Sequence, residues 1–234
     1  KGKTDYVLNP HNILKDIGSF ETDINGVGTG WEAVASADRS IVTDWSVYGE
    51  KSQKLRGTGG GGISVNPSFI VGHKYYLSID YFCVSGSFTI RSAISGGRNL
   101  LVPVGTVSGQ SGKSSVIFTA GENDSLLYLR VGSSSDEFYF DGLVLVDLTE
   151  QNDEDITLED AIAKYPFASV KSTLGGRITV KDSDENIVGQ AYYDAVLRSL
   201  PNGVKDEFNV VEGKYTKKVS DTVSVSGTMF ASLD

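Results

Sequence analysis

The chain has 234 residues, a net charge of -9 and a pI near 4.8, and neither its first 150 residues nor the remainder is basic. This charge disfavours binding to nucleic acid or to an anionic membrane surface. One cysteine and two histidines exclude an internal disulfide, a multi-cysteine zinc site and a histidine-rich metal centre within one chain. The sequence contains no run of about 18 apolar residues and therefore predicts no transmembrane helix. Because the chain starts at Lys1 rather than Met, we expect a fragment of a longer protein.

The first 150 residues predict β-strands separated by glycine- and serine-rich turns. Residues 74–84 alternate with a period of two, so that Leu77, Ile79 and Cys83 fall on one apolar face. Further strands are expected at 87–95, 114–120, 126–131 and 138–146, and a short apolar run includes Val65. Strands at this spacing, with turn residues between them, predict an all-β, jelly-roll β-sandwich over residues 1–150.

The composition changes at position 150. Residues 151–168 predict an acidic linker and a short helix that Thr157 caps and Pro166 ends. Leu158, Ala161 and Ile162 share one face of this helix with Tyr165. Residues 169–234 predict a small β-rich connector domain, cut before its end, with strands at 177–181, 187–188, 204–211, 214–219 and 223–225.

Several short motifs occur in one order: Asn-Ile-Leu at 12–14, Gly-Ser-Phe-Glu at 18–21, Gly-Trp at 30–31, Gly-x-x-Ser-x-Lys-Leu at 49–55 and Tyr-Phe-Asp at 139–141. This order resembles the jelly rolls of carbohydrate-binding modules over residues 9–148. The resemblance implies that Trp31 belongs to the core and that the module binds saccharide.

Segments from residue 140 onward resemble a second group of proteins. Residues 140–149, the Tyr-Pro-Phe that ends the helix, and residues 200–207 are similar to a junction in tail and minor structural proteins of phages of Gram-positive hosts. Residues 151–155 depart from the usual linker of that family. The resemblance implies a tail fibre or receptor-binding protein of the virion tail, facing the extracellular medium and assembled with other tail proteins.

The jelly-roll resemblance also implies a structural Ca²⁺ between the N-terminal segment and the last strand. Calcium takes 6–8 oxygen ligands. Glu21 and Asp141 stand at the matching positions and would supply carboxylates, while backbone carbonyls near Ser19 and Lys51 would complete the shell. The alternative is that both acids are solvated surface carboxylates.

A saccharide site needs aromatic platforms for the apolar faces of sugar rings and polar groups for their hydroxyls. The candidates are Trp45, Tyr48, Tyr76, Asp80, Phe82, Arg91, Tyr128 and Arg130. They form one patch if their strands are neighbours in one sheet. The alternative for each is packing against a loop.

Catalysis has little support in the sequence. Neither His11 nor His73 lies in a sequence context typical of the general base of a catalytic triad. Cys83 is expected in the core. The glycine-rich runs at 59–62 and 109–114 do not match the pattern of a phosphate-binding loop. We therefore expect a non-catalytic phage tail module that binds host cell-wall or surface saccharide, with a homotrimer supplying avidity. The alternatives are a purely structural tail or baseplate component and a hydrolase with two carboxylates about 5–10 Å apart.

Overall fold

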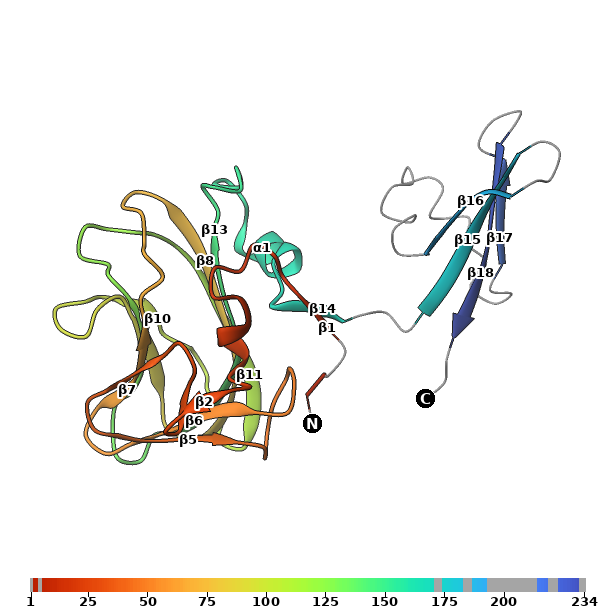
Figure 1. Cartoon of the computed structure of the whole chain (residues 1–234). Helices are drawn as coiled ribbons and strands as arrows, with labels where there is room; N and C mark the ends of the chain where they lie inside the picture. The colour runs from red at the N-terminus through yellow and green to blue at the C-terminus, as the bar shows by residue number, and fades with distance from the viewer. Residues whose placement is uncertain are drawn as a thin grey trace. The chain divides into compact units, whose positions relative to one another are not determined.

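The structure is a computed structural model that describes residues 2–3 and 6–170 and four later strands, 174–182, 187–192, 214–218 and 223–231. The chain divides into two compact units, Lys1–Val170 and Lys171–Asp234. The first is a sandwich of two antiparallel five-stranded sheets (Figure 1), which confirms the predicted jelly-roll fold class. No helix of the described part is long and apolar enough to cross a membrane.

The chain crosses repeatedly between the two sheets. The β8 sheet has the order β11 (Gln110–Thr119), β8 (Lys74–Ser85), β13 (Glu137–Asp147), β6 (Ser52–Gly57) and β5 (Ala37–Val42). The β12 sheet has the order β10 (Asn99–Leu101), β9 (Phe88–Arg91), β12 (Leu127–Val131), β7 (Gly61–Val65) and β4 (Glu32–Val34). The exceptions to the crossing are β5 and β6, which are neighbours in one sheet, and β9 and β10, which are neighbours in the other. A 3-10 helix, η1 (Lys15–Ser19), and a small hairpin of β2 (Asp23–Ile24) and β3 (Val27–Gly28) precede them.

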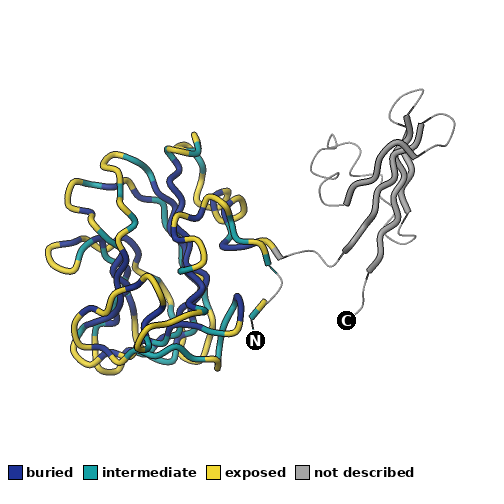
Figure 2. The backbone as a smooth tube through the Cα atoms, viewed as in Figure 1, coloured by how far each residue is buried: buried dark blue, intermediate teal, exposed yellow. Residues whose placement is uncertain are grey.

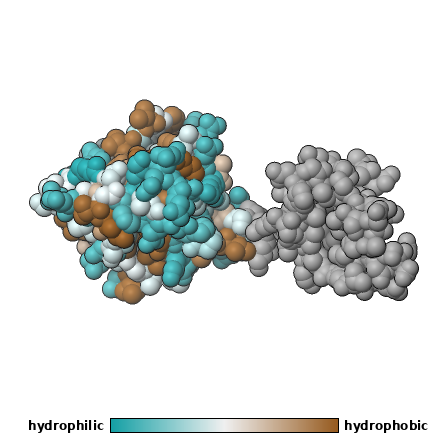
Figure 3. All heavy atoms as spheres, turned by 90° about the horizontal axis from the view of Figure 1, so that it is seen from above, coloured by the Kyte–Doolittle hydropathy of each residue, from teal (hydrophilic) through white to brown (hydrophobic). Residues whose placement is uncertain are grey.

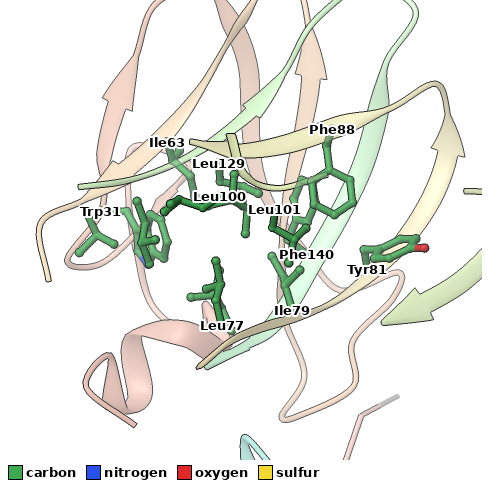
Figure 4. Close-up of a cluster of buried hydrophobic side chains, with 14 of the residues drawn as sticks. Trp31, Ile63, Leu77, Ile79, Tyr81, Phe88, Leu100, Leu101, Leu129 and Phe140 are labelled. Carbon is green, nitrogen blue, oxygen red and sulfur yellow. The ribbon is translucent and has the colours of Figure 1, made fainter. Parts of the chain in front are cut away.

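The core lies between the sheets, where their apolar side chains point toward one another (Figure 4). Leu77, Ile79 and Cys83 of β8 are at most 1% exposed, so the predicted apolar face of this strand is confirmed. Trp31 is also in the core, and its Nε1 donates a hydrogen bond to the Ile17 carbonyl at 3.0 Å. Figure 2 shows buried backbone in the central strands and exposed backbone mainly in the turns.

Asn12 attaches the N-terminal segment to β13 by imitating a strand. Its buried side-chain amide donates to the Leu143 carbonyl at 3.1 Å and accepts from the Leu145 N–H at 2.9 Å. A buried side chain that satisfies two backbone groups in this way replaces part of a missing ladder. The first residue of the Asn-Ile-Leu motif therefore attaches the N-terminal segment to the backbone of β13.

Residues 151–170 fold onto the outer side of the β8 sheet. The helix α1 (Leu158–Lys164) begins at Thr157, whose hydroxyl accepts from the Asp160 N–H at 3.1 Å, as predicted. The chain then forms β14 (Ala168–Val170), which pairs with β1 (Tyr6–Leu8) (Figure 1). This layer has its own apolar cluster, consisting of Tyr48, Tyr76, Val144, Val146, Leu148, Ala161, Tyr165, Phe167 and Ala168.

The predicted apolar face of the helix is only partly right. Ala161 and Tyr165 are buried, but Leu158 and Ile162 are 39% and 40% exposed. The acidic stretch before the helix is also anchored, because Asp153 accepts hydrogen bonds from Lys164 and Tyr165. A helix of 7 residues can bury only a narrow stripe, and here the stripe is centred on Ala161.

The second unit contains a four-stranded antiparallel sheet in the order β16 (Ile187–Tyr192), β15 (Leu174–Asp182), β18 (Val223–Ala231) and β17 (Lys214–Lys218). Four predicted strands correspond to these, with longer ranges for β15, β16 and β18. The predicted strand at 204–211 and the motif at 200–207 lie outside the described residues.

Exposed apolar side chains of the first unit are scattered over loops and short elements. The most exposed are Val104 at 95%, Ile24 at 65% and Val71 at 57%. On the face seen in Figure 3, apolar atoms form separate small patches among hydrophilic ones. Single exposed apolar residues of this kind are normal on soluble domains and mark no interface by themselves.

Asp124 provides a test of the turn between β11 and β12. Its carboxylate accepts hydrogen bonds from Arg98 Nη2 at 2.6 Å and from the Gly121 N–H at 2.8 Å. Burial would raise the pKa of Asp124, but the hydrogen bonds from Arg98, Gly121 and Ser92 outweigh burial and lower it.

A carboxyl group whose pKa is lower in the folded state stabilises the fold above its unfolded pKa, about 3.9, and loses this effect as the pH falls through the folded value. We therefore expect Asp124→Asn to reduce the free energy of unfolding at pH 7 by about 1 kcal/mol. The difference from wild type should shrink below about pH 3. Urea unfolding at both pH values measures this effect. Glu122→Gln, which changes an exposed acid in the same turn, is the control; an equal loss there would contradict the prediction.

Candidate functional site

Two distant carboxylates hold the loop of residues 47–51, which leads into β6. Asp141 Oδ2 accepts hydrogen bonds from the backbone N–H groups of residues 47 and 48 at 2.7 and 2.8 Å. Glu21 accepts from those of residues 50 and 51 at 3.1 and 3.0 Å. A charged acceptor strengthens each of these bonds. The loop is thus fixed at both ends by side chains from the two ends of the sandwich sequence.

Gly49 lies between these two attachment points and must be glycine. Its φ is +67°, a conformation that side chains disfavour, and a Cβ there would lie 2.2 Å from the Glu21 carboxylate. The Glu21 side chain therefore lies directly against the backbone of the loop. Steric exclusion therefore explains the glycine at the first position of the Gly-x-x-Ser motif.

A β-bulge directs Asp141 toward this loop. The register of β13 with β8 shifts between Asp141 and Val144, and Gly142 has a φ of +57°. Asp141 Oδ1 also accepts from the Gly142 N–H at 2.7 Å. Burial nevertheless raises the pKa of Asp141 to about 8, and the nearby Asp80 adds to this effect against the three backbone donors.

The predicted calcium ligands lie around this loop. Ser19 is buried, and its hydroxyl donates to the Asp16 carbonyl at 2.8 Å. A cavity of about 270 Å³ is lined in part by Tyr6, Asp16, Ser19 and Glu21. Burial raises the pKa of Tyr6, the hydrogen bond with Ser19 opposes this, and the charges of Glu21, Asp141 and Asp16 raise it further. Acidic groups from the N-terminal segment and from β13 therefore lie near the Tyr6 hydroxyl.

The described residues contain no group of three or more His, Cys, Asp or Glu side chains placed to hold a metal ion. A cation at this place would depend on two carboxylates and on backbone oxygens, the ligand types that calcium accepts. Oxygen ligands of these types are those of a hard cation, and both carboxylates also accept backbone N–H groups of the 47–51 loop.

The uncovered half of the outer face of the β8 sheet carries a row of three aromatic rings, which we call the aromatic strip: Trp45, Phe82 and Tyr139. The centroids of Trp45 and Phe82 are 6.3 Å apart, and those of Phe82 and Tyr139 are 5.8 Å apart with planes inclined by 24°. All three side chains are half-buried. Trp45 Nε1 donates to Ser111 Oγ at 3.0 Å, which fixes the indole over the sheet edge.

Charged groups flank the aromatic strip on both sides. Lys54 Nζ lies 5.4 Å from the centroid of the Tyr139 ring and 2.7 Å from Glu137 Oε1. On the other side, Lys113 Nζ lies 3.0 Å from Asp80 Oδ2, but the contact is not aligned as a hydrogen bond and leaves that buried oxygen without a donor. Burial raises the pKa of Asp80, and Lys113 opposes this effect.

Two of the predicted platform residues lie in the covered half of the same sheet. Tyr48 and Tyr76 are 5% and 1% exposed, because residues 156–168 pack over them. Tyr48 contacts Phe167 with centroids 4.7 Å apart, and burial raises its pKa to about 12 with help from the charges of Asp80 and Asp141. Neither ring presents a face to a sugar in this structure.

The remaining predicted residues lie on the other sheet. Arg91, Tyr128 and Arg130 belong to β9 and β12, whose outer face is on the opposite side of the sandwich. The structure therefore divides the predicted residues between two faces, and they do not form one patch. Tyr139 and Lys54 were missed as site residues. The alternation of Tyr139 with the apolar Phe138 and Phe140 was the signal that its ring faces outward.

No family model and no curated protein matches the chain. Solved structures match part of the chain at low identity. The C-terminal family 22 carbohydrate-binding module of a Clostridium thermocellum protein is 16% identical, with a TM-score of 0.45, over 56% of this chain and 91% of that one. A family 22 xylan-binding domain from Paenibacillus barcinonensis is 14% identical, with a TM-score of 0.42, over 56% of this chain and 97% of that one.

A bacteriophage tailspike protein matches through its enzymatically active domain, at 11% identity and a TM-score of 0.41, over 58% of this chain and 21% of that one. These matches assign no ligand to this chain.

Gly49 provides a direct test of the loop. We expect Gly49→Ala to destabilise the fold by about 2 kcal/mol or more, because it adds both backbone strain and a clash with the Glu21 carboxylate. Gly105→Ala is the matched control, since Gly105 has a φ of +73° but nothing within 4 Å of its Cβ position. Thermal or urea unfolding compares the two variants. Equal losses would mean that the Glu21 contact contributes nothing.

Proposed function

We propose that residues 2–170 form a non-catalytic saccharide-binding module whose binding surface is the aromatic strip. The observation that carries the proposal is the row of three half-buried rings on the outer face of the β8 sheet, with neighbouring centroids 6.3 and 5.8 Å apart. Aromatic rings present large apolar faces at little conformational cost. Consecutive pyranose rings of an oligosaccharide present apolar faces that can stack on such a row of aromatic rings.

The groups beside the rings suit hydroxyls. The Lys54 ammonium and the Ser111 hydroxyl lie at the two ends of the strip and can hydrogen-bond to sugar oxygens. A shallow surface of this kind buries little area, so the affinity of one site is expected to be weak.

The hydrolase alternative has less support at this surface. Asp80 and Asp141 are paired across β8 and β13, which brings two carboxylates together. However, Asp80 is 8% exposed and Asp141 is fully buried and bound to three backbone N–H groups. A glycosidase needs one carboxyl group at the leaving oxygen and one at the sugar carbon or its water. This pair is turned toward the 47–51 loop instead.

The setting that we propose is a phage tail fibre or receptor-binding protein that contacts host cell-surface saccharide. The sequence resemblance of residues 140–149 to phage tail proteins supports it. Weak sites gain avidity when several copies are linked, so a homotrimer is the proposed assembly. The competing proposal is a tail or baseplate component with a purely structural role, which the covered Tyr76 and the buried Tyr128 favour.

The decisive experiment is co-sedimentation of the purified chain with Gram-positive cell walls. We expect Trp45→Ala to weaken wall binding at least tenfold, which corresponds to about 1.4 kcal/mol. Trp45→Phe should retain most of the binding because it keeps an aromatic face. Light scattering of the same preparation tests for a mass of three chains.

Either of two outcomes would reject the saccharide proposal. One is the absence of wall binding by a well-folded chain at high concentration. The other is equal binding by wild type and Trp45→Ala. Either outcome would favour the competing proposal of a purely structural role.

Calcium binding is the second part of the proposal. Glu21 and Asp141 would hold the cation together with backbone oxygens near Ser19 and Lys51, and it would neutralise acids that now converge near Tyr6. A ligand that binds only the folded state raises its stability by mass action. A cation here would attach the N-terminal segment to β13.

We therefore expect Ca²⁺ at millimolar concentration to raise the melting temperature of the wild-type chain and a chelator to reverse the rise. Glu21→Gln should abolish the response, whereas Mg²⁺, which prefers a rigid octahedral shell, should produce little of it. A melting temperature that is unchanged by Ca²⁺ and chelator in wild type would reject the site.

A further inference from the structure

The outer face of the β12 sheet carries a cluster of arginines around one buried tyrosine. Tyr128 pairs with Arg91 of β9, and Arg130 lies two residues further along the same face of β12. Arg39 reaches this face from β5, since its Nε donates to the Gly62 carbonyl at 2.9 Å, and Gly62 is the register partner of Arg130. We call Arg39, Arg91 and Arg130 the arginine cluster.

Tyr128 shows that the three charges converge. Its side chain is 3% exposed, yet it belongs to neither apolar cluster of the unit. Burial raises the pKa of Tyr128, while the charge and hydrogen bond of Arg130 and the charges of Arg91 and Arg39 oppose this effect. The three positive charges therefore all act on its hydroxyl.

The glycine run at 59–62 makes room for this cluster. A Cβ at Gly60 would lie 2.8 Å from Arg130 Nη2, so the guanidinium lies against bare backbone. A side chain at Gly60 would displace it. Gly60 of this run thus has a specific neighbour, the Arg130 guanidinium.

These arginines have no acidic partner. In the part of the chain that the structure describes, the carboxylates within 4.0 Å of an arginine belong to the pairs Arg56–Glu137 and Arg98–Asp124. Glu32, which the register places on the same face, is exposed and forms no ion pair there. Arg39 and Arg91 donate to backbone carbonyls, and these bonds leave their charge uncompensated.

The chain has a net charge of -9, yet these three half-buried arginines form no ion pair within 4.0 Å in the described residues. The Asp136 carboxylate and the Arg130 guanidinium both lie near the position that a Cβ would take at Gly132, but they form no ion pair with each other. Grouping like charges is unfavourable unless an anion compensates them. Their planar forks also match the geometry of carboxylate and phosphate groups. If the only role of these side chains were to cover Tyr128, their apolar stems would be sufficient and the three charges would have no purpose.

We propose that the arginine cluster is a second binding site, which takes a carboxylate or phosphate group of an acidic glycopolymer. It lies on the opposite face of the sandwich from the aromatic strip and does not depend on binding there. The two faces would recognise different features of a ligand: the strip binds ring faces and the cluster binds charge.

The test is a titration of the chain with an oligogalacturonate, with its methyl ester and with a glycerol-phosphate oligomer, at low and at physiological salt. The methyl ester keeps the sugar rings and removes the charge. We expect wild type to bind at least one acidic probe and not the ester, with affinity falling as salt rises. The acidic probe that binds distinguishes carboxylate from phosphate.

The double variant Arg91→Gln, Arg130→Gln should lose at least tenfold in affinity for the acidic probe. Arg56→Gln is the matched control, because it removes an exposed arginine from the other sheet. Circular dichroism confirms folding. If the double variant unfolds, Arg130→Lys keeps the charge, removes the fork and should still weaken binding.

Three outcomes would overturn the proposal. The first is the absence of binding of either acidic probe at low salt. The second is equal binding of the methyl ester. The third is an equal loss in Arg56→Gln, which would mean that binding reflects diffuse charge.

Discussion

The attachment of the 47–51 loop to Glu21 and Asp141 is the constraint on which the rest of the first unit depends. The two acids are 120 positions apart in sequence, and the loop brings them to neighbouring places through four backbone N–H donors. Lys3 extends the arrangement, because it exchanges two backbone hydrogen bonds with the same loop, both at 2.8 Å. Trp45 stands just before this loop and Tyr48 within it. The loop therefore places one ring on the open half of the sheet and the other under the covering layer.

Much of the sandwich could be predicted from alternation, because a strand with one buried face has a period of two. The pattern of β8 gave the correct inner face from Leu77 to Cys83. Short strands such as β4 and β10, with 3 residues each, carry too few positions for a period to be visible. Their places follow from pairing with longer neighbours, which a linear pattern does not contain.

The candidate site was harder to predict for a physical reason. Alternation assigns a residue to the outer face of a strand but does not say whether another segment covers that face. Tyr76 and Phe82 share the outer face of β8, yet the first is buried by residues 156–168 and the second is open. One signal was present: residues 143–146 of β13 are apolar at every position, which is typical of a strand covered on both sides. The division of Arg91 and Phe82 between two sheets had no such signal.

The pairing of β1 with β14 has a mechanical consequence. Tyr6 pairs with Val170 at one end of a ladder of three residue pairs, and Leu8 pairs with Ala168 at the other. The chain therefore enters β1 and leaves β14 at the same end of this ladder. Tension applied through the two strands loads the pairs one after another, as in opening a zip, instead of shearing them together. Under such a pull the two hydrogen bonds between Lys3 and the 47–51 loop are loaded before the ladder, and the two five-stranded sheets, with their inner core, are loaded last.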